Sequence, residues 1–314
     1  MCDNVINFEV VLASGEVVEA NANSHKDLWI ALKGGLNNFG VVTRFDLPVF
    51  SQGKIWGGAV VTALDNYPAT MQALHDFTVQ ETPDEEAHVI VALINQGGAE
   101  TFGAFVYHTG GKVSAPALAA FSNMEPKYFH TIREDSLLGF TDEQANWNPS
   151  GNRVTYFTTS VQLDVKLLND IRGLWAETCR SLESVTGLAF SIVYQPISKG
   201  LLRHSAQRGG NSLGLKPEDG PIVIILANPV HSQASDDDLV SSAVLDLINK
   251  INALAEERGK SARYRFTNYG FKTQAILEGY GKEQLDFLHS TSKAYDPDSF
   301  FQRAVSSGFK LPNA

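Results

Sequence analysis

The segment Lys33-Gly-Gly-Leu-Asn-Asn-Phe-Gly-Val-Val-Thr-Arg-Phe-Asp-Leu47 joins a short predicted helix to an extended run. The helix is predicted over residues 25–33, because Ser24 and Asp27 have the spacing of a capping box. The two glycines that follow it are typical of a helix end. The segment therefore marks the boundary between a helix and the strand predicted over residues 39–50.

Two further strands are predicted before this helix, over residues 5–12 and 16–19, and the Ser14-Gly15 pair between them indicates a turn. Residues 5–12 alternate only weakly between apolar and polar side chains, so both faces of this strand are expected to be buried. Residues 1–55 are thus predicted to form a compact ββαβ piece.

The rest of the chain contains more predicted strands than helices, and short glycine links join several of the strands. Strands are predicted over residues 88–96, 101–108, 154–163, 188–196 and 222–230. Amphipathic helices are predicted over residues 67–80, after Asp164 and after Ser235. This pattern predicts an α+β fold with a large antiparallel sheet covered by helices, beside the small ββαβ piece.

Composition excludes several classes of function. The chain has 314 residues and a formal net charge of −10, which argues against nucleic acid and anionic membranes as partners. No apolar stretch reaches the length of a membrane span, and no signal peptide is visible. Its 2 cysteines, Cys2 and Cys179, form neither a disulfide framework nor a zinc motif. We expect a cytoplasmic protein that acts on a small molecule.

The quoted glycine segment resembles a signature of fungal FAD-linked oxidoreductases of the berberine bridge enzyme type, which have the vanillyl-alcohol-oxidase fold. Segments along the whole chain resemble that family in the same order: residues 2–12, 194–197, 208–215, 263–269, 295–302 and 308–311. The resemblance implies that residues 1–55, with 266–314 returning to them, are a remnant of the FAD-binding domain. It implies that residues 56–265 are the substrate domain.

The resemblance also implies which residues contact FAD if the cofactor is retained: Gly35, Asn38, Gly40, Val41, Val42, Asn268 and Tyr269. Family members bind the pyrophosphate with an N-terminal part that this sequence does not contain, so the chain is interpreted as N-terminally truncated. A pyrophosphate needs a nest of N–H donors, and residues 34–40 supply half of one. We therefore expect no cofactor.

Three functions remain open. The first is a flavin-free, non-redox cyclase or isomerase of the Diels–Alder or hetero-Diels–Alder type, acting on a reactive intermediate of fungal secondary metabolism. Such a reaction needs orientation and a few hydrogen-bond donors, but neither a nucleophile nor a metal. The alternative is an FAD-dependent oxidase present as its C-terminal part. The third is a non-catalytic protein that binds a small molecule.

Five residues are candidates for catalysis, because aromatic walls and polar donors would hold and polarise a carbonyl-bearing substrate: Tyr107, Tyr194, Arg203, His204 and His231. For each tyrosine and histidine, a purely structural role is the more common one. The cationic group at Arg203 and His204 fits a solvated loop equally well.

Two other patterns favour structural roles. Residues 210–214 match a nucleophile elbow, but they lack the strand and helix that flank a real one. Residues 236–238 are three aspartates at a predicted helix start, where the helix dipole favours negative charge, so no metal site is predicted.

Because losing half of a domain exposes apolar surface, we expect a homodimer.

Overall fold

The computed structural model describes residues 2–147, 150–305 and 307–312, which form two compact units. The first unit comprises Met1–Phe50, Lys199–Gly220 and Arg263–Ala314, and the second comprises Ser51–Ser198 and Pro221–Ala262. The sequence analysis places residues 199–220 in the substrate domain, whereas the contacts of the structure group them with the first unit. They belong to the first unit because Lys33 Nζ donates to the carbonyl of Arg208, and the amide of Ser212 donates to the carbonyl of Lys33.

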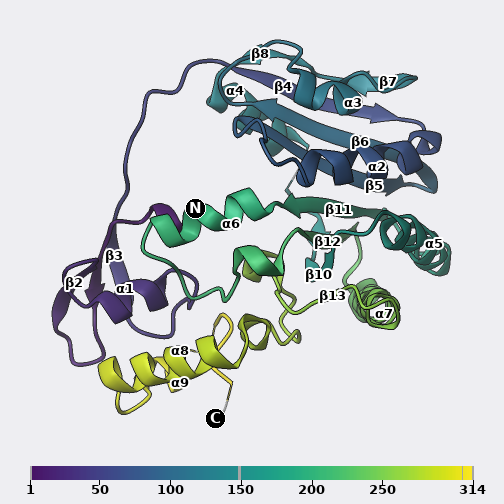
Figure 1. Ribbon diagram of the computed structural model, residues 1–314. Coiled ribbons are helices and arrows are strands. Elements are labelled where there is room, and N and C mark those ends of the chain that lie inside the picture. Colours follow the sequence, from purple (N-terminus) through teal and green to yellow (C-terminus); the bar gives the residue numbers. More distant parts are fainter. Residues whose placement is uncertain (1, 148–149, 306, 313–314) are drawn as a thin grey trace. The chain divides into compact units, whose positions relative to one another are not determined.

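The first unit contains a three-stranded antiparallel sheet in the order β2-β1-β3 (Figure 1). Helix α1 packs on β2 and on α8. The helices and strands of this unit are β1 Asn7–Val11, β2 Val17–Asn21, α1 Lys26–Leu32, β3 Val41–Asp46, α6 Lys199–Gln207, α8 Lys282–Tyr295 and α9 Phe300–Arg303. Short 3-10 turns lie at Cys2–Asn4, Pro217–Asp219, Thr267–Tyr269 and Leu277–Tyr280.

Only one face of β1 is apolar, so the prediction that both faces are buried is wrong. Phe8 and Val10 are buried on one face, whereas Asn7 and Glu9 point to the other. On that other face the side chain of Arg44 pairs with Glu9 and with two neighbouring carboxylates. Charged side chains therefore cover the surface that the sequence analysis expected to be apolar.

The second unit is built on a ten-stranded antiparallel sheet in the order β13-β10-β12-β11-β5-β6-β4-β7 (Figure 1), with β8 paired to β4 and β9 paired to β12. Its strands are β4 Ile55–Thr62, β5 Ala87–Gln96, β6 Ala99–His108, β7 Lys127–His130, β8 Arg133–Asp135, β9 Arg153–Val154, β10 Phe157–Gln162, β11 Ala189–Ile197, β12 Ile222–His231 and β13 Ser261–Ala262. Its helices are α2 Tyr67–Thr78, α3 Ala119–Ser122, α4 Leu137–Asn146, α5 Val165–Ser181 and α7 Asp237–Glu257, with 3-10 turns at Leu64–Asn66, Pro116–Leu118 and Ala234–Asp236.

Helices α2, α5 and α7 cover one face of this sheet. Tyr67 of α2 lies against Phe102 of β6 and Tyr194 of β11, while α5 packs on α2 and α7. Phe140 of α4 lies against Tyr107 of β6. Tyr107 is five positions after Phe102 on this strand, so the two side chains point to opposite faces of the sheet. Helix α4 therefore covers part of the other face. The predicted α+β fold with a large antiparallel sheet covered by helices is confirmed.

Local signals placed most elements within a few residues of their observed bounds. Asp164 caps α5 by accepting a hydrogen bond from the amide of Leu167 at 2.8 Å. The predicted capping box at Ser24 is wrong, because His25 is the N-cap of α1 and its left-handed backbone turns Ser24 away. Helices α4, α6 and α8 were not predicted. None of the helices in the described residues is long and apolar enough to cross a membrane.

Candidate cofactor site

The turn after α1 forms the centre of the first unit. Gly34 has a φ of +131°, and a Cβ added there would lie 2.6 Å from Leu213 Cδ2 and 2.8 Å from Ser212 Oγ. Ser212 is fully buried, and its hydroxyl lies 3.2 Å from the carbonyls of Ala31 and Lys33. Residues 210–214 are therefore packed against this turn, with the Ser212 hydroxyl facing two backbone carbonyls.

Lys33 is fully buried beside this turn. Its Nζ lies 3.4 Å from the centre of the Trp29 ring and donates to the carbonyl of Arg208 at 3.0 Å. Burial lowers the pKa of Lys33, because a low-dielectric environment disfavours the charged amine. The side chain thus joins α1 to the segment after α6.

The C-terminal segment closes over residues 37 and 38. Asn38 donates to the carbonyls of Gly35 at 2.7 Å and Phe309 at 3.1 Å, and Lys310 Nζ lies 3.1 Å from Asn37 Oδ1. Asn38 Oδ1 is buried and has no hydrogen-bond partner among the described residues. A buried acceptor of this kind costs free energy unless a donor reaches it.

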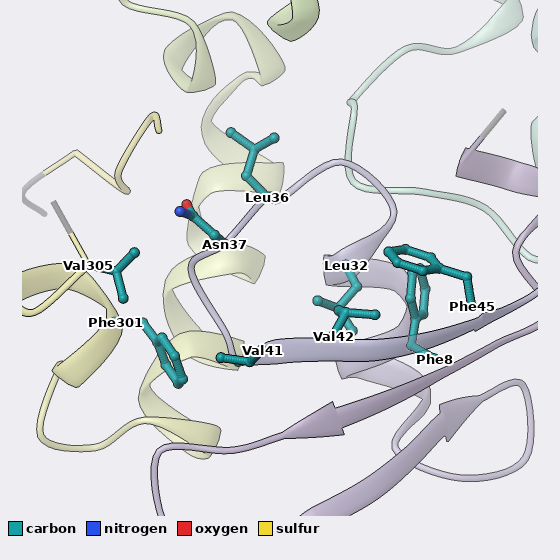
Figure 2. A pocket seen from close by; sticks show the side chains of 10 residues that line it. Phe8, Leu32, Leu36, Asn37, Val41, Val42, Phe45, Phe301 and Val305 are labelled. Carbon is teal, nitrogen blue, oxygen red and sulfur yellow. The ribbon is translucent and has the colours of Figure 1, made fainter. Parts of the chain in front are cut away.

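A cavity of about 370 Å³ lies beside the glycine segment (Figure 2). The rings of Phe8 and Phe45 meet edge to face at one side, with centroids 5.4 Å apart, and Phe301 lies at the other side. The lining residues are Phe8, Leu32, Leu36, Asn37, Gly40, Val41, Val42, Phe45, Phe301 and Val305. Val41 and Phe45 are more than half exposed, so this apolar surface is open to a ligand or a partner.

The lining fits one part of an FAD molecule and not another. Flat aromatic rings suit a cavity walled by phenylalanine and valine side chains. The lining contains no cationic side chain among the described residues, so it offers no charge for a pyrophosphate. Of the predicted FAD contacts, Gly40, Val41 and Val42 line the cavity, whereas Gly35 and Asn38 are buried beside it. The residues present therefore fit an aromatic ring of the cofactor.

Asn268 and Tyr269 lie in the 3-10 turn Thr267–Tyr269 of the same unit. Asn268 is exposed, and the Tyr269 ring contacts Phe266 edge to face at 4.8 Å. Thr267 Oγ1 lies 2.6 Å from the hydroxyl of Tyr280, which donates to the carbonyl of Gly34 at 3.0 Å. The turn is thereby connected to the glycine segment, and the flavin contacts of Asn268 and Tyr269 stay predictions.

The five predicted catalytic residues are divided between the two units. Arg203 and His204 belong to α6 in the first unit, and the other three belong to the second unit. Tyr194 is fully buried under α2, with its hydroxyl 3.0 Å from that of Tyr67. Tyr107 lies on the opposite face of the sheet and accepts a hydrogen bond from Gln144 at 3.3 Å. Their catalytic roles stay predictions.

His231 is buried at the end of β12, where its Nε2 lies 3.0 Å from Asp237 Oδ1. Asp237 opens α7 and also pairs with Arg153, so its carboxylate serves as more than a partner of the helix dipole. The hydrogen bond from Arg153 lowers the pKa of Asp237 to about 2, and the contact with His231 acts in the same direction. His231 is therefore held in place by a carboxylate that also forms an ion pair with Arg153.

This ion pair predicts a pH dependence of stability. The folded-state pKa of Asp237 lies below its ordinary value of 3.8, so the stabilisation is present above that value and is lost as the pH falls toward 2. Between about pH 4 and pH 2, the free energy of unfolding should therefore fall less in the Asp237→Asn variant than in the unmodified protein. Urea unfolding of both proteins at pH 2, 3, 4 and 7 measures this, and identical pH curves would contradict it.

The walls of the cavity could not be recognised in the sequence. Phe8, Leu36 and Phe301 come from three segments far apart in the chain, and each is an ordinary apolar residue locally. The available signal was the run of apolar side chains in residues 41–45, which contribute exposed surface on β3. Only the fold brings the other walls to that strand.

No family model matches the chain. It is 33% identical to the FAD-dependent monooxygenase FUP4 of Fusarium proliferatum, over 99% of this chain and 62% of that protein. It is 30% identical to the FAD-dependent monooxygenase CTB5 of Cercospora nicotianae, over 99% of this chain and 70% of that protein. The chain thus spans about three fifths of the length of relatives such as FUP4.

Solved structures share the fold at low sequence identity. 6-Hydroxy-D-nicotine oxidase from Arthrobacter nicotinovorans superposes with a TM-score of 0.71 at 17% identity, over 96% of this chain and 65% of that one. A berberine-bridge-like protein from Physcomitrella patens gives a TM-score of 0.67 at 16% identity, over 100% of this chain and 66% of that one.

These relatives correct the expected function. A flavin-free cyclase was the leading interpretation, with no cofactor, and it is wrong: relatives matched along almost all of this chain are FAD-dependent monooxygenases. The FAD-dependent alternative is the better interpretation. The chain belongs to this family of FAD-dependent monooxygenases from fungi, and its fold is that of the berberine-bridge type of FAD-linked oxidoreductase.

Proposed function

We propose that this protein is an FAD-dependent oxidoreductase and that its first unit binds an aromatic ring of the cofactor. The observation that carries the proposal is the apolar cavity of about 370 Å³ beside the glycine segment. When bound, FAD supplies the redox chemistry. The relatives' names support this activity.

The residues of this chain have separate roles in the proposal. Val41, Val42 and Phe45 exclude water from one side of the ring, and Asn38 Oδ1 offers a buried acceptor near the cavity. Tight turns keep the backbone of this segment close to its neighbours: a Cβ on Gly40 would lie 2.5 Å from Val10 Cγ1. The fixed backbone therefore presents the apolar wall without rearrangement.

For the substrate, a small molecule, we propose the sheet face that carries Tyr107. This side chain lies on the face away from α2, and burial raises its pKa, so its hydroxyl stays protonated and able to donate. The nearby Gln144 amide already donates to the oxygen, which orients the hydroxyl hydrogen elsewhere. Tyr107→Phe tests this role without changing the ring.

FAD titration tests the proposed cofactor. A ligand that binds only the folded state at a hundredfold excess over its Kd stabilises it by about 2.7 kcal/mol, so we expect FAD to raise the melting temperature. Val41→Asp should weaken FAD binding at least tenfold, because it places a charge on the apolar wall. Flavin fluorescence and thermal unfolding measure both effects.

Val17→Asp is the matched control. Val17 is 59% exposed and Val41 is 54% exposed in the same sheet, but Val17 does not line the cavity. Its FAD affinity should therefore equal that of the unmodified protein. An unchanged melting temperature at millimolar FAD would reject the proposed cofactor, whereas equal losses in both variants would reject the proposed position.

A further inference from the structure

Three potential metal ligands meet in the second unit, apart from the cofactor site. Nε2 of His108 lies 3.3 Å from Asp84 Oδ2 and 3.9 Å from Glu86 Oε2. All three ligand atoms lie within 4.8 Å of one another. His108 ends β6, and the two acidic residues come just before β5, its partner in the sheet. The pairing of these strands therefore creates the cluster.

The surrounding backbone orients the ligands. His108 is 3% exposed, so its Nε2 faces the two carboxylates and little else. Asp84 Oδ1 accepts from the amide of Glu86 at 3.3 Å, which leaves Oδ2 toward the imidazole. A Cβ on Gly110 would lie 2.3 Å from Glu86 Oε2, so the absence of a side chain at this position makes room for that carboxylate.

The cluster has an excess of negative charge. Two carboxylates share one imidazole, and among the described residues no lysine or arginine forms an ion pair with Asp84 or Glu86. Like charges this close destabilise each other unless a cation lies between them. The carboxylates are 27% and 60% exposed, so an ion can enter from solvent.

We propose that Asp84, Glu86 and His108 bind one divalent transition-metal ion, such as Zn²⁺ or Mn²⁺. Metal–ligand bonds of about 2.0–2.2 Å place tetrahedral ligand atoms about 3.3–3.6 Å apart, and one imidazole with two carboxylates suits such ions. The separation of 3.3 Å already fits, and the exposed Glu86 side chain closes the remaining gap. Solvent supplies the fourth ligand.

Binding has one structural cost, which gives a spectroscopic signature. The amide of Lys112 donates to His108 Nδ1 at 3.3 Å, so Nε2 carries the proton of the neutral ring. A metal at Nε2 displaces that proton to Nδ1, and the Lys112 amide must then turn away. Metal binding therefore shifts the Lys112 amide resonance together with the ring nitrogens of His108.

Calorimetry with Zn²⁺ and absorption with Co²⁺ test the proposal on chelator-treated protein. We expect one ion per chain and a visible Co²⁺ absorption spectrum typical of a four-coordinate ion. Glu86→Gln and Asp84→Asn should each bind the ion at least tenfold more weakly. Glu81→Gln is the control, because Glu81 is an exposed acid in the same segment outside the cluster. It should bind as tightly as the unmodified protein.

Glu86→Gln alters an exposed side chain, so this variant should stay folded. A loss of metal binding in it would then reflect the lost carboxylate and not unfolding. Absence of saturable binding overturns the proposal. Binding that Glu86→Gln leaves unchanged, or that leaves the His108 ring nitrogens unshifted, also overturns it, because the ion then lies elsewhere. None of these outcomes depends on FAD, so the metal site and the proposed cofactor fail or succeed separately.

Discussion

Replacing Gly214 by alanine is expected to lower the free energy of unfolding of the first unit by about 3–5 kcal/mol. Gly214 has a φ of +69°, where a side chain costs about 1–2 kcal/mol. An added Cβ would also lie 2.0 Å from the carbonyl oxygen of Tyr280. Because that oxygen belongs to the backbone, relief requires the 3-10 turn Leu277–Tyr280 to move away from residues 210–214.

Gly210→Ala is the matched control in the same loop. Its φ is +80°, but a Cβ there has no heavy atom within 4 Å. Only the backbone cost remains, about 1–2 kcal/mol. Urea unfolding, with hydrogen exchange of the amides in residues 30–40 to report on the first unit, compares the two. Equal losses of stability would contradict the close contact with Tyr280.

Tyr67→Phe is expected to destabilise the second unit by about 2–3 kcal/mol. The Tyr67 hydroxyl lies 2.5 Å from the carbonyl of Leu168 and 3.0 Å from the hydroxyl of Tyr194, in a region closed to water. Removing it leaves the Tyr194 hydroxyl buried without this partner and the Leu168 carbonyl with its helical hydrogen bond alone. Tyr194→Phe should cost only about 1 kcal/mol, because Tyr67 keeps its bond to Leu168.

The double variant measures the coupling between the two tyrosines. Its loss of stability should fall short of the sum of the single losses by about 1 kcal/mol, since each single variant already breaks the shared bond. Burial raises the pKa of both hydroxyls, so they stay neutral donors at any physiological pH. If Tyr194→Phe lowered turnover tenfold without loss of stability, the residue would belong to the catalytic site rather than the core.

The fold was largely predictable because its signals are local. The helix predicted after Asp164 is α5, which Asp164 caps, and apolar side chains such as Leu168 and Ile171 line the buried face of that helix. Helix α6 was missed because its apolar face contains little more than Leu202, which is the buried residue of this element. Its place in the first unit depends on contacts with residues near the N-terminus, which sequence spacing does not contain.

The candidate site was predictable only at positions where glycine residues indicate an unusual backbone geometry or a close contact. Gly34 and Gly40 make close contacts; the sequence indicated Gly34 as part of a helix end, and the resemblance implied Gly40 as a contact of FAD. Phe8 and Phe301 could not be identified, because their meeting depends on the folded chain. The same holds for Asp84 and His108, which lie on different segments and become neighbours through the pairing of β5 with β6.

The function was misjudged for a different reason. An incomplete cradle at residues 34–40 was taken as loss of the cofactor, but a cofactor can take its phosphate contacts from one part of a protein and its ring contacts from another. The apolar walls around Val41 and Phe45 favour the second kind of contact. The incomplete set of phosphate donors in residues 34–40 therefore does not decide whether the apolar walls bind the ring of the cofactor.

The first unit consists of three segments that are far apart in the chain, and this determines when its contacts can form during synthesis. Asn38 bonds to the carbonyl of Phe309, a partner 271 residues later, so on the ribosome that bond must wait for almost all of the chain. Until then α1 has no α8 to pack on, and its apolar side chains stay exposed in the nascent chain. A chaperone that shields apolar segments would thus act first on residues 1–50, while Pro221–Ala262 completes the sheet of the second unit beforehand.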